Sequence, residues 1–124
     1  MVKGKRIKKI IKSINKEWST YYFKFILDNL DKPWDWSYIS RNPNITWEII
    51  KENPDKDWSW EYVSQNPNIT MDMIRDNPDK PWRWDWISRN PNLTMEMIRD
   101  NPMQNWSWYK ISKNKNITWK IIQD

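Results

Sequence analysis

A step of 24 residues constrains the fold of this chain more than any other feature of its sequence. Ser40, Asn42 and Thr46 each return three times at this spacing, with no insertion between copies. Two tryptophans in every copy keep the same step, at Trp34, Trp36, Trp58, Trp60, Trp82, Trp84, Trp106 and Trp108. A fixed period of this size is typical of stacked units, none of which can bury its apolar face alone. The sequence therefore predicts a repeat array whose core contains these tryptophans.

The second half of each unit is predicted to be a short helix. Thr46 is a residue type favoured at the helix N-cap, and Ile45 and Ile50 stand at the two positions of a hydrophobic staple. Pro54 then ends the helix, because the residue before proline is pushed out of the helical region. We expect this helix at about residues 47–53 and in every copy. The predicted caps are Thr46, Thr70, Thr94 and Thr118, and the predicted isoleucine core is Ile50, Ile74, Ile98 and Ile122.

The first half of each unit is also predicted to be helical, from near Pro33 to the Asn-Pro at Asn42. Its N-cap falls at Asp31 or two residues later. Helices of two to three turns are not stable alone in water, so packing within and between units must stabilise them. The predicted fold is all-α, an α-solenoid of two-helix repeats.

The whole chain, residues 1–124, is predicted to be one repeat domain. Full repeats span 34–57, 58–81 and 82–105, between a diverged capping unit at 7–33 and a truncated unit at 106–124. We expect residues 1–6 to fray. An apolar helix face is expected to cover the first repeat through Ile7, Ile10, Ile11 and Ile14. Polar residues suit the last unit to a terminal position, at Lys110, Lys115 and Lys120.

The basic residues from Lys3 to Lys16 leave an alternative open for this N-terminal helix. Basic amphipathic helices are typical of segments that bind an anionic membrane or nucleic acid. The capping interpretation is favoured because Ile10 and Ile14 precede Trp34 and Tyr38 by one period. We therefore expect neither nucleic acid nor a membrane as a partner.

Charge is distributed by segment. Residues 1–30 carry eight basic and two acidic side chains, a net charge of +6, whereas residues 31–105 carry nine and thirteen, a net charge of −4. Residues 106–124 carry four and one, a net charge of +3. Like charges at the two ends disfavour end-to-end stacking, so the sequence predicts a monomer.

The residue inventory argues against an enzyme. The chain has no His, no Cys and one Gly, so it lacks the commonest general base, the usual zinc ligands and phosphate-cradling loops. Paired carboxylates such as Glu48 and Glu52 recur in the internal units beside a basic residue, a pattern typical of a solvated helix face. We expect no catalytic residue, no cofactor and no metal site.

No segment resembles a signal peptide or approaches the ~20 apolar residues of a membrane span. Together with the absence of cysteine, this favours an intracellular, cytoplasmic protein.

The asparagine that recurs at Asn42 and its equivalents has two interpretations. Stacked once per unit, as Asn42, Asn66, Asn90 and Asn114, the side-chain amides could bridge backbone groups of successive units. The plainer interpretation is that these residues only form turns.

Positions that differ between copies are where a partner would bind. The candidates are Tyr38, Tyr62, Trp86, Met71 and Met95. Methionine side chains adapt to varied partners, but gap filling in the core is the favoured interpretation of the methionines. The predicted function is a non-enzymatic scaffold that binds an unknown protein partner. Carbohydrate or peptide binding on exposed Trp and Tyr is an alternative, and it requires rings such as Trp36 and Trp60 at the surface.

The wording of the repeat resembles two families. NPNITWEII with NPDKDWSWEYVSQNP is similar to tryptophan-rich tandem repeats of giant DNA viruses of the mimivirus type. The 24-residue length and the NPNxT helix starts resemble the leucine-rich variant repeat, although tryptophan and isoleucine replace leucine. The resemblance covers about residues 20–124. It implies an α-solenoid and, for the viral family, an interaction role in the host cell.

Overall fold

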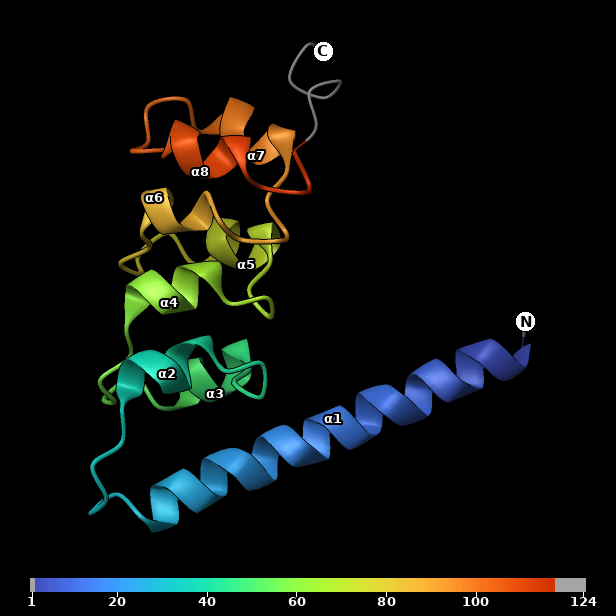
Figure 1. Cartoon of the computed structure of the whole chain (residues 1–124). Helices are drawn as coiled ribbons and strands as arrows, with labels where there is room; N and C mark the ends of the chain where they lie inside the picture. The colour runs from blue at the N-terminus through green and yellow to red at the C-terminus, as the bar shows by residue number, and fades with distance from the viewer. Residues whose placement is uncertain (1, 118–124) are drawn as a thin grey trace.

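The computed structural model describes residues 2–117, and its regular elements in this range are eight α-helices. One long helix, α1, is followed by seven short ones: α2 (Trp36–Arg41), α3 (Trp47–Glu52), α4 (Trp60–Gln65), α5 (Met71–Asp76), α6 (Trp84–Ile87), α7 (Met95–Asp100) and α8 (Trp108–Ser112). Figure 1 shows the short helices in successive layers of one column, from α2 and α3 at one end to α8 at the other. The prediction of an all-α fold built from repeated short helices is confirmed.

The second helix of each unit begins where its cap predicts. The Thr46 hydroxyl accepts the main-chain N–H of Ile49, and Thr70 and Thr94 do the same at α5 and α7. Each of these helices ends one residue before the predicted boundary, and the asparagine at that boundary is the C-cap: α3 ends at Glu52 and is capped by Asn53. Thr118 and Ile122 lie outside the described residues.

The first helix of each unit begins later than the sequence predicts. Its N-caps are Asp35, Ser59, Arg83 and Ser107. The residues before each helix form a non-helical turn. In the second unit this turn is closed by the Trp58 indole N–H, which donates to the main-chain carbonyl of Asn53 at 2.8 Å. Trp34, Trp82 and Trp106 close the same turn in their own units.

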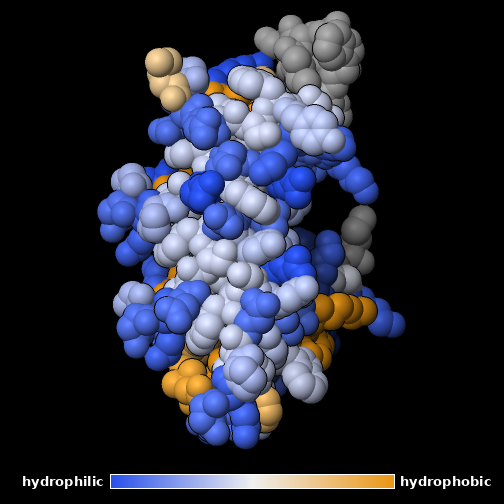
Figure 2. All heavy atoms as spheres, turned by 60° about the vertical axis from the view of Figure 1, so that its left-hand side comes forward, coloured by the Kyte–Doolittle hydropathy of each residue, from blue (hydrophilic) through white to orange (hydrophobic). Residues whose placement is uncertain are grey.

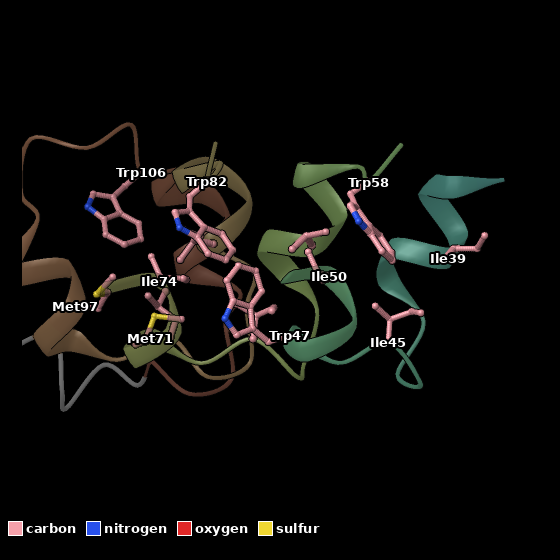
Figure 3. Packing of buried hydrophobic residues seen from close by; sticks show 14 of the residues in the cluster. Ile39, Ile45, Trp47, Ile50, Trp58, Met71, Ile74, Trp82, Met97 and Trp106 are labelled. Carbon is pink, nitrogen blue, oxygen red and sulfur yellow. The ribbon is translucent and has the colours of Figure 1, made fainter. Parts of the chain in front are cut away.

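The core runs along the column between the two sets of short helices. Trp58, Trp82 and Trp106 are buried at successive levels, with Ile50 and Ile74 beside them (Figure 3). Ile98 is buried as well. Trp36, Trp60 and Trp84 are half-buried, and each meets the first tryptophan of the next unit edge to face at 5.1–5.3 Å. Aromatic pairs therefore join adjacent units as well as filling each one.

The recurring asparagines join the units, as the bridging interpretation predicts. The amide of Asn66 donates to the main-chain carbonyl of Ser40 at 2.8 Å, and Asn114 donates to that of Ser88 at 3.0 Å. The same side chains also form local turns, because the Asn66 side-chain oxygen accepts the N–H of Asn68. Both interpretations therefore hold at once.

The recurring serines make a second link between units. The Ser40 hydroxyl donates to the carbonyl of Trp36 in its own helix at 2.6 Å and accepts the main-chain N–H of Ser59 at 2.8 Å. Ser64 and Ser88 accept the corresponding N–H groups of later units at 3.0 Å. These three serines are fully buried, and their hydroxyls have hydrogen-bond partners.

Helix α1 (Val2–Asp28) corrects the predicted capping unit in its N-terminal part. It is continuous, so residues 2–6 are helical, and its N-terminal part extends away from the column (Figure 1). Ile7, Ile10, Ile11 and Ile14 do not cover the first repeat, since each is about half exposed. Only the C-terminal part packs, through Ser19, Phe23 and Ile26. The physical reason is that residues 18–22, WSTYY, stand where each repeat has an Asn-Pro turn, so no proline interrupts α1.

The structure also corrects Trp108 as a core residue. Its side chain is 63% exposed, whereas Trp36, Trp60 and Trp84 at the same place in earlier units are half-buried. Those three rings are covered by the first tryptophan of the following unit. No described residue stands at that place for Trp108.

Candidate interaction surface

Three of the predicted partner-binding residues lie on equivalent helices of successive units. Tyr38 is on α2, Tyr62 on α4 and Trp86 on α6. The rings of Tyr62 and Trp86 lie 5.5 Å apart, tilted by 56°. Tyr38 is largely exposed, while the other two rings are half-buried. One period of sequence therefore becomes one step along a surface row.

Cationic side chains fill the spaces in this row. The Arg41 guanidinium lies 4.2 Å from the Tyr38 ring centroid and 5.3 Å from that of Tyr62, so it sits between the two rings. The Lys110 ammonium lies 4.1 Å from the Trp86 centroid. Cation–π contacts at exposed sites contribute about 0.5–1 kcal/mol each. We call Tyr38, Arg41, Tyr62, Trp86 and Lys110 the aromatic–cation row.

The cations of the row are held by rings rather than by carboxylates. Ion pairs elsewhere in the described residues use Lys32, Lys56, Arg75, Lys80 and Arg83. The positive charges of Arg41 and Lys110 therefore remain available to an anionic group. The carboxylates on α4 and α6, those of Glu61 and Asp85, form ion pairs with Arg83 at 3.0 and 3.4 Å.

A shallow, open hollow of about 440 Å³ lies at the α1 end of the row. Tyr22, Trp34, Tyr38 and Arg41 contribute to its lining. The Tyr22 hydroxyl accepts the side-chain amide of Asn42 at 3.2 Å, and burial raises the pKa of this phenol above its ordinary value. The neutral Tyr22 hydroxyl thus accepts the hydrogen bond from Asn42, whereas in the next unit a main-chain carbonyl, that of Ser40, accepts the hydrogen bond from Asn66.

The two methionine candidates do not belong to this surface. Met71 is buried in the core, and Met95 is half-buried against it. Met71 follows the cap of α5 and takes the core position that Trp47 has in α3, so it fills space instead of offering a contact face. The interpretation of Met71 as a partner-binding residue is therefore wrong.

The alternative of carbohydrate binding requires tryptophan rings that are open to solvent. Trp58 is buried, and Trp36 and Trp60 turn their faces to the next unit at 5.3 and 5.2 Å. Trp34 is half-buried, with its indole N–H bound to Asn29 at 2.7 Å. These rings belong to the interior of the stack, whereas Trp108, at the place of Trp36 in its own unit, is 63% exposed.

The paired carboxylates lie on an exposed helix face, as the sequence predicts. Arg75 contacts Asp72 at 3.1 Å, and Glu96 of the next unit at 3.6 Å. Within residues 2–117 no group of three or more acidic side chains is arranged to hold a metal ion. Asp72 and Glu96 are therefore paired with one arginine across two units.

A second exposed surface was missed by the capping interpretation. The outward side of α1 presents six large apolar residues: Ile7, Ile11, Ile14, Trp18, Tyr21 and Phe25. Their steps are 4, 3, 4, 3 and 4 residues, which keeps them on one face of a helix. This spacing extends the isoleucine pattern through the aromatic residues, and it was the signal in the sequence that could have revealed the surface.

No family model, curated protein or solved structure matches this chain. In the described residues, no helix has both the length and the apolar character needed to cross a bilayer.

Proposed function

We propose that the chain is a non-enzymatic repeat scaffold that binds an acidic segment of another protein along the aromatic–cation row. The observation that carries the proposal is the position of Arg41. Its guanidinium lies 4.2 and 5.3 Å from the centroids of two tyrosine rings of adjacent units, and it takes part in none of the ion pairs described above. Aromatic and arginine side chains are enriched in protein interfaces, where they contribute most of the binding energy.

The layout of the row favours an extended ligand. Equivalent helices place one aromatic residue per unit, so contacts recur at a regular interval along the column. Repeat proteins commonly bind along such surfaces. The resemblance to viral tryptophan-rich repeats adds the proposal that the partner is a host protein and that binding takes place in the cytoplasm of an infected cell.

Affinity capture tests this proposal. The wild-type chain and a variant carrying Tyr38→Ala and Arg41→Ala are immobilised and exposed to lysates of infected and uninfected cells. Both replaced side chains are exposed, so the fold is expected to persist. Met103→Ala is the control, because Met103 is almost fully exposed and belongs to the loop between α7 and α8.

The expected result is a partner that the wild type and the Met103→Ala control retain and that the double variant loses. Binding of the captured partner should also weaken as salt rises, because screening reduces the attraction between acidic groups and the row. Equal capture by all three chains would contradict the proposal.

A further inference from the structure

The outward apolar stripe of α1 is the largest feature that the aromatic–cation row does not explain. We define the stripe as Ile7, Ile11, Ile14, Trp18, Tyr21 and Phe25, whose side chains are 46–73% exposed. From Ile7 to Phe25 it extends about 27 Å along the helix at 1.5 Å per residue. Figure 2 shows hydrophobic side chains gathered on the α1 side of the molecule, while the repeat column presents a mostly polar surface. Contiguous exposed apolar surfaces of this kind mark interaction sites.

The chain's own repeats touch the stripe only at its C-terminal end, where the Phe25 ring meets Trp34 edge to face at 6.0 Å, and Phe25 is still 60% exposed. The residues of α1 that pack on the first repeat, Ser19, Phe23 and Ile26, lie about 130° around the helix from the centre of the stripe at 3.6 residues per turn. A flat surface laid against the stripe would therefore meet α1 with the column turned to the other side. Figure 1 shows the N-terminal part of α1 extending clear of the column.

Most of the charged residues around the stripe are basic. Arg6 and Lys24 fall on one border, beside the acidic Glu17 and Asp28, and Lys8 falls on the other. Lys5, Lys9, Lys12 and Lys16 lie on the opposite side of α1, and Lys3 falls in line with the stripe. Residues 1–30 carry eight basic and two acidic side chains, a net charge of +6. The occupant of the stripe is therefore expected to be apolar along its centre and anionic overall, to match the net positive charge of this segment.

A second copy of α1 fits this description poorly. Two such helices would bring together two segments of net charge +6, and like charges repel. In a paired helix the flanking positions are Lys8, Asn15 and Tyr22 on one side and Ile10, Glu17 and Lys24 on the other. In a parallel pair these positions would place Ile10 against Asn15 and Glu17 against Tyr22, which are not the opposite charges that select a partner helix.

We propose that α1 lies in the interfacial region of an anionic lipid membrane, with the stripe inserted among the headgroups and Arg6, Lys8 and Lys24 against the lipid phosphates. An apolar face containing Ile and Trp, a basic opposite face and low net hydrophobicity are the features of helices that lie in this plane. Trp18 and Tyr21 suit the boundary between headgroups and acyl chains. Each basic residue near an anionic surface strengthens binding by about fivefold. The membrane surface is separate from the aromatic–cation row, so this proposal does not rest on the proposed function.

Vesicle co-sedimentation of the full chain tests the proposal. The probes are vesicles of phosphatidylcholine alone and vesicles that also contain about 30% phosphatidylserine. One variant carries Ile7→Ala, Ile11→Ala and Ile14→Ala, which removes apolar surface and keeps helix-forming residues. The matched control carries Ile7→Leu, Ile11→Leu and Ile14→Leu, which keeps the apolar surface. A denaturant melt of each variant checks that the repeats are unchanged.

The wild type and the leucine control are expected to sediment with the anionic vesicles and to bind neutral vesicles at least about tenfold more weakly. The alanine variant should bind the anionic vesicles at least about 100-fold more weakly, because three large side chains leave the inserted face. The Tyr38→Ala and Arg41→Ala variant should bind these vesicles as the wild type does.

Three results would overturn the proposal. In the first, the wild type would fail to bind anionic vesicles and would form a dimer that the alanine substitutions abolish. In the second, it would fail to bind the vesicles and would capture an acidic amphipathic peptide. In the third, the alanine variant binds anionic vesicles as tightly as the wild type, which would show that the basic residues act without the stripe.

Discussion

The side-chain amide of Asn90 donates a hydrogen bond to the main-chain carbonyl of Ser64, 26 residues earlier in the chain, at 2.9 Å. The same amide reaches the carbonyls of Asn66 and Ile69 at 3.3 and 3.1 Å, and its oxygen accepts the N–H of Asn92 at 2.8 Å. Asn90 is fully buried. One side chain thus satisfies buried polar groups of two adjacent units.

Asn90→Ala should therefore lower the free energy of unfolding by about 3 kcal/mol, because it leaves buried carbonyls without donors. Urea denaturation followed by circular dichroism measures the change. Asn105→Ala is the control, since Asn105 is exposed in a loop and such changes stay within about 0.5 kcal/mol. A loss below about 1 kcal/mol at Asn90 would show that the amide is dispensable.

Trp60 and Trp108 occupy the same place in two units and differ in their covering. Trp60 meets Trp82 and Trp47 edge to face at 5.2 and 6.4 Å, whereas Trp108 is 63% exposed. We expect Trp60→Ala to cost about 3 kcal/mol through lost packing, and Trp108→Ala to cost less than about 1 kcal/mol. Equal losses in urea melts of the two variants would contradict the assigned packing.

The cap at Thr70 offers a smaller, local test. Its hydroxyl accepts the N–H of Met73 at 3.3 Å at the start of α5. Thr70→Ala should cost about 1 kcal/mol, because one main-chain donor loses its partner. Thr20→Ala in the exposed middle of α1 should change stability by less than about 0.5 kcal/mol. Thermal or urea melts of both variants distinguish a cap from an ordinary surface threonine.

Stability at high pH should depend on Tyr22. Burial raises the pKa of its phenol in the folded chain, so its contribution is fully present below the unfolded pKa of about 10 and is lost as pH rises through the folded pKa. Wild type should therefore lose more stability than Tyr22→Phe between about pH 9 and pH 11. Urea midpoints measured across this range test it. Tyr21→Phe is the control because Tyr21 is largely exposed, and it should follow the wild type.

The repeat itself was predictable because each unit states its own local chemistry. Thr46 begins a helix by capping it, and the following Asn-Pro ends it, whatever the neighbouring units contain. The start of the first helix was misplaced because Trp58 fixes the preceding turn through its indole N–H. That contact has no signature in the periodicity.

The position of α1 was not predictable from the 24-residue register. Ile10 and Ile14 precede Trp34 and Tyr38 by one period, which suggests that they pack in the same way. Equivalent positions reach the core, however, only if the chain also turns between the two helices of the unit. No Asn-Pro precedes Tyr22, so α1 continues without a break and Ile10 and Ile14 stay exposed. The absence of a helix breaker was the decisive signal.

The surface row was predictable in its positions and not in its contacts. Variation between copies identified Tyr38, Tyr62 and Trp86. Arg41 was missed although its position also varies, as Gln65, Arg89 and Lys113 in the other copies, because its contact with the rings arises only in the folded stack. Met71 was assigned to the surface because methionine suits both cores and interfaces. Its burial depends on the depth of its helix in the stack.

The links between units also decide which parts of the chain are free to change. Each link joins a recurring side chain in one unit to a main-chain group in the other: Asn90 to the carbonyl of Ser64, and Ser64 to the N–H of Arg83. Position 83 is serine in other copies, and the bond persists because the N–H group is present in any residue except proline. The residues that join the units are therefore different from the variable residues on the outer surface of the repeat. Substitutions at the variable outward positions should therefore leave the hydrogen bonds between units intact.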